Sequence, residues 1–165
     1  MIQEKINHIK KISEKYSNDI TISLVSDFLN WFIEKLNLNF NSKSPNLKYK
    51  KWEVYFVNLW QNIWSELNKT RPCIIYSKKS FNSKNSVIII PLKSFKWKII
   101  DKFQIKIEKD EKNKLIKDSI CDIFHIKNIS TKRIWLKKWE INLEKIKQID
   151  NKIIKMFDLK IKNEE

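Results

Sequence analysis

The chain has 165 residues and a hydrophobic fraction of 42%, which is enough for one globular domain with a small appendage. No apolar run approaches the roughly 18–20 residues of a membrane span, and the first residues lack the unbroken apolar stretch of a secretory signal. We therefore expect a cytoplasmic protein that does not bind a membrane. The net charge of +15 favours a polyanionic partner such as RNA or DNA, although AT-rich coding would also raise the lysine content.

The N-terminal part of the chain has helical periodicity. Apolar residues at helical spacing predict one helix over residues 2–16, and a broader apolar face predicts a second from about Ser23 to Asn37. A segment rich in Asn and Ser, up to Pro45 and Asn46, is typical of a linker. Residues 1–45 carry six Lys or Arg against five acids, whereas the remaining 120 residues carry 28 against 14. We therefore divide the chain into a helical extension with its linker, residues 1–45, and a basic domain, residues 46–165.

The basic domain consists mainly of short β-branched or aromatic runs separated by polar turns. Several short strands in succession predict a small barrel. The expected strands are Glu53–Leu59, Pro72–Ser77, Ser86–Leu92, Lys102–Ile107 and Ser119–Ile126. Apolar residues at intervals of three and four then predict a closing helix over Asn142–Leu159. The predicted fold class is therefore α+β.

The cysteines and histidines do not form a metal-binding pattern. Cys73 and Cys121 stand far apart without a CxxC motif, and the two histidines are not at ligand spacing. We expect both thiols to behave as small buried hydrophobic groups in a reducing compartment. Neither a metal site nor another cofactor is expected.

The composition is abnormal in two residue types, because the chain has no glycine and seven tryptophans. An average protein contains about 7% glycine. Most of the tryptophans stand at turns and strand boundaries, where the backbone needs the freedom of glycine. We hypothesise that the gene encodes glycine as UGA at most of these positions, namely Trp52, Trp60, Trp64, Trp97, Trp135 and Trp139. The alternative is a protein that lacks glycine and is rich in tryptophan, and the pattern does not decide the origin of Trp31.

With glycine at three of these positions, residues 52–72 become G-E-V-Y-F-V-N-L-G-Q-N-I-G-S-E-L-N-K-T-R-P. This segment resembles the opening of the MazF/PemK toxins, which have a first strand, a G-S-E loop, and an R-P pair at the start of the second strand. Here the loop is Trp64-Ser65-Glu66 and the pair is Arg71-Pro72. The resemblance extends over about residues 50–160.

The resemblance implies a fold and an activity. The fold is a small SH3-like β-barrel of the MazF/PemK/CcdB kind with a C-terminal helix, paired as a homodimer and here preceded by the helical extension. The activity is sequence-specific, metal-independent cleavage of single-stranded RNA by an endoribonuclease, the toxin of a toxin–antitoxin system, with a cognate antitoxin as partner. The 2′-hydroxyl of the RNA attacks the neighbouring phosphate, which requires a proton acceptor, a proton donor and positive charge for the phosphorane.

Arg71 matches the catalytic arginine of the family, and its guanidinium can bind phosphate oxygens through two hydrogen bonds. The alternative is a surface arginine near a strand start. The family's second catalytic residue is a Thr or Ser after the third strand, and this sequence departs from the pattern there. Lys93 aligns most directly and Ser94 follows it. Either Ser94 serves with the help of a local bulge, or Lys93 replaces the hydroxyl with a charge.

Three further candidates have less specific patterns. His125 is the only histidine of the barrel and suits proton transfer, although its alternation with neighbouring residues is equally typical of a solvent or dimer face. Glu66 resembles the loop acid of the family, next to Ser65. It either supports the loop by hydrogen bonds or acts in catalysis.

Basic residues interleaved with aromatic ones follow the third predicted strand. Such a stretch is typical of an RNA-binding edge, and equally of a solvated strand and loop. Lys96 and Lys98 within it are candidate RNA contacts, and so is Lys127 in the segment Lys127–Ile134, which resembles the late strand and tight turn of the family. Two other functions remain open: a barrel that binds nucleic acid or protein without cutting, which the substitution at Lys93 favours, and a lysine-rich structural barrel whose helical arm binds a partner.

Overall fold

The chain forms two compact units, Met1–Ser42 and Lys43–Glu165, here called the helical unit and the sheet unit. The structure is a computed structural model that describes residues 2–15, 19–40, 48–60, 67, 69–82, 85–96, 101–111 and 113–159.

The helical unit contains α1, Ile2–Lys15, and α2, Asp19–Phe40, so both predicted helices are confirmed. The second helix is longer at both ends than the predicted segment. Glu4 in the first turn of α1 and Lys15 in its last turn both suit the helix dipole. Apolar side chains of both helices remain partly exposed. Among the described residues, none of the helices combines the length and the apolar character needed to cross a membrane.

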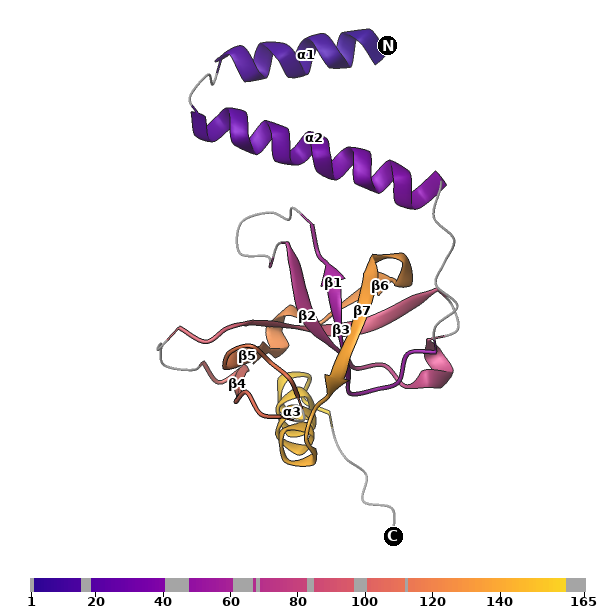
Figure 1. The fold of residues 1–165 in the computed structure, drawn as a ribbon, viewed down its shortest axis with the longest axis vertical. Coiled ribbons are helices and arrows are strands. Elements are labelled where there is room, and N and C mark those ends of the chain that lie inside the picture. Colours follow the sequence, from indigo (N-terminus) through magenta and orange to yellow (C-terminus); the bar gives the residue numbers. More distant parts are fainter. Residues whose placement is uncertain are drawn as a thin grey trace. The chain divides into compact units, whose positions relative to one another are not determined.

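In its described residues the sheet unit contains seven antiparallel strands in the order β4-β5-β3-β2-β1-β7, with β6 paired to β3 (Figure 1). The strands are β1 Glu53–Asn58, β2 Thr70–Ile75, β3 Ser86–Ser94, β4 Gln104–Ile107, β5 Ser119–Asp122, β6 Lys127–Ser130 and β7 Ile134–Glu140. Short 3-10 helices lie at η1 Lys79–Phe81, η2 Ile123–His125 and η3 Thr131–Arg133. In the described part of the chain the edge strands β4 and β7 do not pair, so the sheet is not closed.

The long strand β3 connects the two parts of this sheet. Its first half pairs with β6, its middle with β2 and its last residues with β5. Consecutive β3 residues face different core clusters, with Ile89 in one and Ile90 in the other. One strand therefore contributes to two buried faces, which is how a short open sheet can enclose its core.

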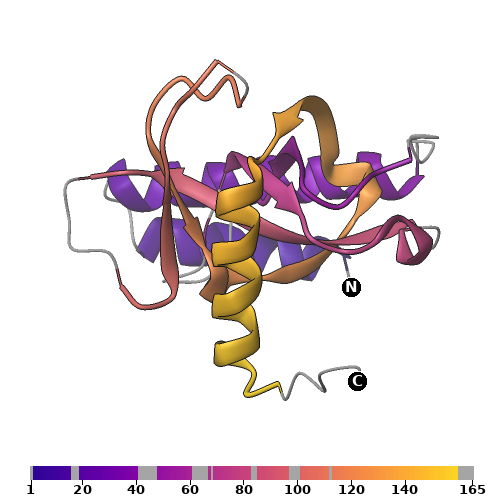
Figure 2. The same ribbon diagram turned by 90° about the horizontal axis from the view of Figure 1, so that it is seen from below.

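The helix α3, Leu143–Met156, lies against the sheet and closes one of these clusters (Figure 2). Ile149 and Ile153 of α3 are buried in the cluster that includes Ile90 and Leu92 of β3. The side chain of Asn142 accepts a hydrogen bond from the backbone N–H of Lys145, so it caps the helix. The predicted α+β fold with a closing C-terminal helix is confirmed.

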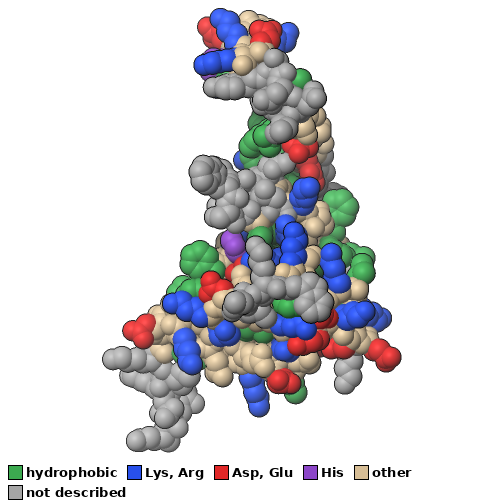
Figure 3. All heavy atoms as spheres, turned by 90° about the vertical axis from the view of Figure 1, so that its left-hand side faces the viewer, with side chains coloured by type: hydrophobic (Ala, Val, Ile, Leu, Met, Phe, Trp, Pro, Cys, Tyr) green, Lys and Arg blue, Asp and Glu red, His purple; other side chains and the backbone are tan. Residues whose placement is uncertain are grey.

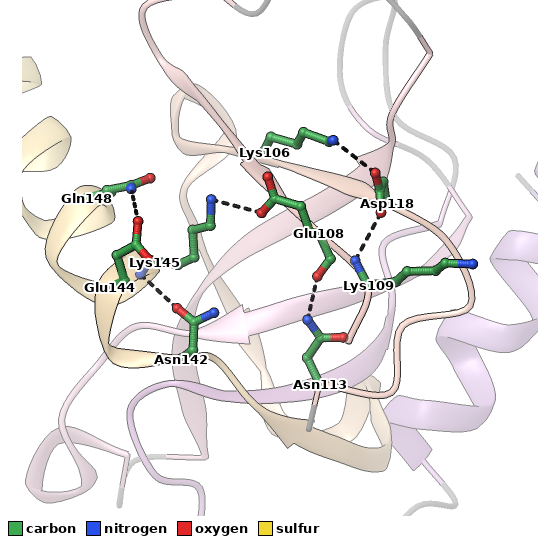
Figure 4. Close-up of polar contacts among 9 residues, drawn as sticks. All are labelled: Lys106, Glu108, Lys109, Asn113, Asp118, Asn142, Glu144, Lys145 and Gln148. Atoms are coloured by element: carbon green, nitrogen blue, oxygen red, sulfur yellow. Dashed lines mark hydrogen bonds and ion pairs between the residues drawn. The ribbon is translucent and has the colours of Figure 1, made fainter. Parts of the chain in front are cut away.

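Polar contacts also join α3 to the turn after β4 (Figure 4). Lys145 Nζ lies 2.9 Å from Glu108 Oε2, and Asn113 donates a hydrogen bond to the backbone oxygen of Glu108. On the same face, Lys106 and Asp118 form an ion pair of 3.0 Å between β4 and the residue before β5. Asn113 is buried and fixes the loop that connects these two strands.

Two predicted details of the strands differ from the structure. The strand predicted over Ser119–Ile126 ends at Asp122, because the chain enters the 3-10 turn η2. The strand β7 continues to Glu140, so Trp135 and Trp139 lie inside a strand and not at a turn. The pair Lys137-Lys138 between them resembles a turn in sequence, and the β1–β7 pairing is irregular at two places.

The backbone supports the glycine hypothesis at two positions. Trp52 has φ 75° and Trp60 has φ 63°, both in the left-handed region that bulky residues avoid and glycine enters freely. Trp52 precedes β1 and Trp60 follows it. Trp64 and Trp97 lie outside the described residues.

Candidate functional site

The candidate site lies where β2 begins and β3 ends. The two strands run antiparallel with Cys73 opposite Pro91. The two strands pair only over Cys73–Ile75, and the continuation of this register places Arg71 level with Lys93. Residues directly opposite each other on antiparallel strands project from the same face of the sheet. The strand register thus brings together the arginine and the lysine that the sequence singled out.

Two cavities meet at this position and share the lining residues Arg71, Lys93 and Ser94. The smaller cavity has a volume of about 220 Å³ and is walled largely by apolar residues. The larger has a volume of about 580 Å³ and includes Lys96 and Gln104. Two positive side chains therefore border the junction, where an anionic group of a ligand could contact both.

The pairing of β3 with β5 distinguishes Lys93 from Ser94. Lys93 is opposite Ile120 and Ser94 is opposite Ser119, without a register shift. By the alternation of strand side chains, Lys93 shares a face with the position opposite it, Arg71, and Ser94 projects to the other face. The bulge that would turn Ser94 toward Arg71 is therefore not part of this pairing, although Ser94 lines both cavities together with Lys93.

Beneath Lys93 lies a buried carboxylate that the sequence did not single out. Asp122, the last residue of β5, has only 4% of its side chain exposed. Its Oδ2 accepts hydrogen bonds from Lys93 Nζ and from Gln104 Nε2, the latter at 3.0 Å. His125 Nε2 lies 3.8 Å from the same oxygen. Three polar side chains of the site region thus converge on one oxygen atom.

His125 is on the 3-10 turn η2 and not on a strand, so its predicted alternation with Ile123 and Lys127 does not apply. Its side chain is 19% exposed, and its ring lies 6.1 Å from that of Phe124. Within the described residues it does not line either of the two cavities. It is connected to the site through Asp122.

The candidate RNA contacts are distributed unevenly. Lys96 lines the larger cavity. Lys127 is opposite Ile89 of β3, on the side of the sheet that carries Arg71. Burial raises the pKa of the Cys73 thiol, and the positive charges of Arg71 and Lys127 act in the opposite direction. Ser65, Glu66 and Lys98 lie outside the described residues.

The remaining electrostatic features concern the thiols and the surface. Cys73 and Cys121 are free and buried, as predicted, and burial raises the pKa of both. No cluster of three His, Cys, Asp or Glu side chains suited to a metal ion occurs in the part of the chain that the structure describes. Lys and Arg side chains are spread over the sheet unit in Figure 3, with Asp and Glu among them.

The chain is similar in sequence to a known protein family. Residues 50–157, more than half of the chain, match the model of the PemK-like, MazF-like toxins of type II toxin–antitoxin systems. The chain belongs to this toxin family. Its members are known as endoribonucleases. No curated protein sequence matches the chain.

Solved structures of MazF toxins share the fold at low sequence identity. MazF from Deinococcus radiodurans is 11% identical, with a TM-score of 0.57 over 69% of this chain and 100% of the other. An endoribonuclease in complex with its cognate antitoxin, from a mycobacterial species, is 12% identical, with a TM-score of 0.54 over 69% and 99%. The Mycobacterium tuberculosis toxin MazF-mt6 is 14% identical, with a TM-score of 0.52 over 66% and 99%.

Sequence reasoning found Arg71 and Lys93 but missed Asp122 and Gln104. A single acid in the apolar run Ile120-Cys121-Asp122-Ile123 was the available signal. A carboxylate in such a run is buried only when it has partners, so it marks a polar network. The partners themselves come from other strands, and the fold was needed to identify them.

Proposed function

We propose that the chain is the toxin of a toxin–antitoxin pair and cuts single-stranded RNA in the cytoplasm, at a specific sequence and without a metal ion. The observation that carries this proposal is the convergence of Arg71 and Lys93 on the junction of two cavities. Family membership supports the reaction class, and the net charge of +15 supports a polyanionic substrate. The fold alone would not support an activity, since one fold hosts many functions.

In the proposed reaction the RNA supplies its own nucleophile. The 2′-oxygen bonds to the neighbouring phosphorus, the bond from phosphorus to the 5′-oxygen breaks, and the products carry a cyclic phosphate and a 5′-hydroxyl. A guanidinium fork at Arg71 can bind two phosphate oxygens as negative charge develops. Lys93 adds a second charge, and its ammonium gives the departing 5′-oxygen the proton that makes it a hydroxyl. His125, which shares Asp122 with Lys93, is the candidate acceptor for the 2′-proton.

The partners follow from the same family membership. A structural relative is described in complex with its cognate antitoxin, and we propose that this chain also has one. We further propose that the sheet unit forms a homodimer, because an open sheet with unpaired edges is otherwise prone to uncontrolled pairing. Sedimentation of the protein at micromolar concentration tests the dimer.

Arg71→Ala tests the central assignment. We expect cleavage of a long single-stranded RNA, in the presence of a metal chelator, to fall by about 10²–10³. Arg71→Lys should rescue little, because an ammonium does not reproduce the two-pronged contact. The variants should be made both in the chain with tryptophan at the six positions and in a counterpart with glycine there.

Lys106→Ala is the matched control, because it also removes one positive charge from the sheet unit but does not line either cavity among the described residues. It should cleave like the parent. His125→Ala should lower the cleavage rate if His125 accepts the proton. It should leave the cleavage rate unchanged if His125 has only a packing role. Full activity of Arg71→Ala would remove the site assignment.

The second candidate function is a barrel that binds RNA without cutting it. Lys93 favours it, because the family has a hydroxyl at this position and an ammonium can bind a phosphate without assisting cleavage. Retention of a labelled RNA by a parent protein that leaves it intact would select this alternative.

A further inference from the structure

Asp122 occupies a position where a carboxylate is costly. It follows Cys121 and precedes Ile123, both fully buried, and its own side chain is almost fully shielded from solvent. Taking an ionised carboxylate out of water costs several kcal/mol unless charged or hydrogen-bonding partners replace the water. The partners must therefore explain why the residue is there.

The strand register explains how Asp122 reaches Lys93. Lys93 is opposite Ile120, and Asp122 is two residues further along β5, on the same face. Such diagonal neighbours have Cα atoms about 7–8 Å apart, within reach of a lysine side chain. Gln104 on the other side is directly opposite Asp122 in the β4–β5 pair. The carboxylate thus lies between a lysine from β3 and an amide from β4.

Lys93 needs such a partner because of its neighbours. It borders both cavities together with Arg71, so two positive charges of the same site repel each other. A lysine also has a flexible four-carbon stem that would place its ammonium in solvent. The contact with Asp122 compensates the repulsion and fixes the stem in one direction, while Gln104 holds the carboxylate.

We propose that Asp122 is a positioning residue that holds the ammonium of Lys93 at the junction of the two cavities, where it contacts the scissile phosphate. Together the two residues replace the hydroxyl that the family has at position 93. This inference rests on the proposed function. It adds that the ammonium of Lys93, where the family has a hydroxyl, is accompanied by the buried carboxylate of Asp122 on the neighbouring strand.

A double-mutant cycle tests the inference in the full chain. Asp122→Asn keeps the shape but removes the charge, and we expect the cleavage rate at saturating RNA to fall about 10–100-fold. Lys93→Thr restores a hydroxyl of the family type. In this background Asp122→Asn should cause a clearly smaller loss than in the parent, because Lys93 is gone and only the contact of Asp122 with His125 remains. A merely structural role would give the same loss in both backgrounds and would overturn the proposal.

Asp150→Asn is the matched control. Asp150 of α3 accepts a hydrogen bond from the Tyr76 hydroxyl and pairs with Lys51 at 3.4 Å, but it borders neither cavity among the described residues. It should leave cleavage unchanged in both backgrounds. Thermal unfolding of every variant shows whether it is folded. If Asp122→Asn does not fold, Gln104→Ala replaces it in the cycle, since it removes the amide that donates a hydrogen bond to the carboxylate.

A second measurement separates this inference from the proposed function. Binding of a fluorescent random-sequence RNA with 2′-O-methyl groups, which cannot be cut, is followed by anisotropy. If the parent binds but does not cleave, the proposed activity is wrong, and the same cycle measured on affinity decides the role of Asp122. Unchanged cleavage and affinity in Asp122→Asn, or a parent that neither cleaves nor binds RNA, would overturn the inference.

Discussion

The helical unit and the sheet unit differ in where their apolar side chains lie. In α2 the side chain of Phe32 is 52% exposed, whereas Ile90 in β3 is fully buried. Both residues belong to clear apolar patterns in the sequence. Periodicity therefore identifies the element and its apolar face, but only the fold shows whether another element covers that face. The sheet unit carries its own core, and every described residue that lines the two cavities belongs to it.

The largest expected effect is the loss of unfolding free energy when a cavity is made in the core of the sheet unit. Ile90→Ala removes a fully buried side chain that is opposite Ile74 and packs in the α3 cluster, and should cost about 2–5 kcal/mol of unfolding free energy. Phe32→Ala on α2 is the matched change and should shift the unfolding of the sheet unit by less than about 0.5 kcal/mol. Urea unfolding measures both. Equal losses would mean that the two units share one core.

A smaller effect concerns the backbone at Trp52 and Trp60. Comparison of Gly with Ala at each position removes the same indole, so only the left-handed backbone distinguishes the two variants. Gly should be more stable than Ala by about 1–2 kcal/mol. At Trp139, inside β7, the order should reverse by about 0.5–1 kcal/mol.

Thermal unfolding compares the three pairs of variants. Ala as stable as Gly at positions 52 and 60 would contradict the backbone argument. The gene gives an independent reading, because UGG codons at these positions would remove the hypothesis that UGA encodes glycine there.

The sequence predicted elements whose signals are local. Short β-branched or aromatic runs identified β1 and β3, and the intervals of three and four identified α3, each within a few residues. The strand β7, Ile134–Glu140, was not predicted, because Lys137-Lys138 interrupts the apolar pattern there. In the site, Arg71 and Lys93 came from motif positions, whereas Asp122 depends on a contact with a residue 29 positions away. Such contacts depend on the pairing register of strands that are far apart in the chain. No local sequence pattern predicts that register.

A still smaller change in stability is expected at the contact between α3 and the turn after β4. The ion pair with Lys145 lowers the pKa of Glu108 below its ordinary value of 4.5. A carboxyl with a lowered folded pKa contributes stability above the unfolded pKa and loses it as the pH falls through the folded pKa. Glu108 is half exposed, so the contribution should stay below about 1 kcal/mol.

Glu108→Gln should therefore be less stable than the parent near neutral pH, and the difference should disappear as the pH falls below about 4.5. Thermal unfolding of both proteins across this range measures it. A difference that persists in acid would assign the effect to packing and not to charge.

Deletion of the helical unit should have the smallest effect on the stability of the sheet unit and on its cleavage of RNA. Residues 43–165 contain both core clusters, the described cavity residues, and all of the positive net charge, because residues 1–42 carry five Lys against five acids. We therefore expect this fragment to fold, and to cleave RNA at the rate of the full chain, since the core clusters and the residues proposed to bind phosphate all lie within it. The fragment with Arg71→Ala is the control and should lose cleavage as the full chain does. The measurement is the melting temperature together with the cleavage rate. An aggregated or molten fragment would break the comparison, because it would show that exposed apolar side chains of α1 and α2 cover part of the sheet unit in the intact protein.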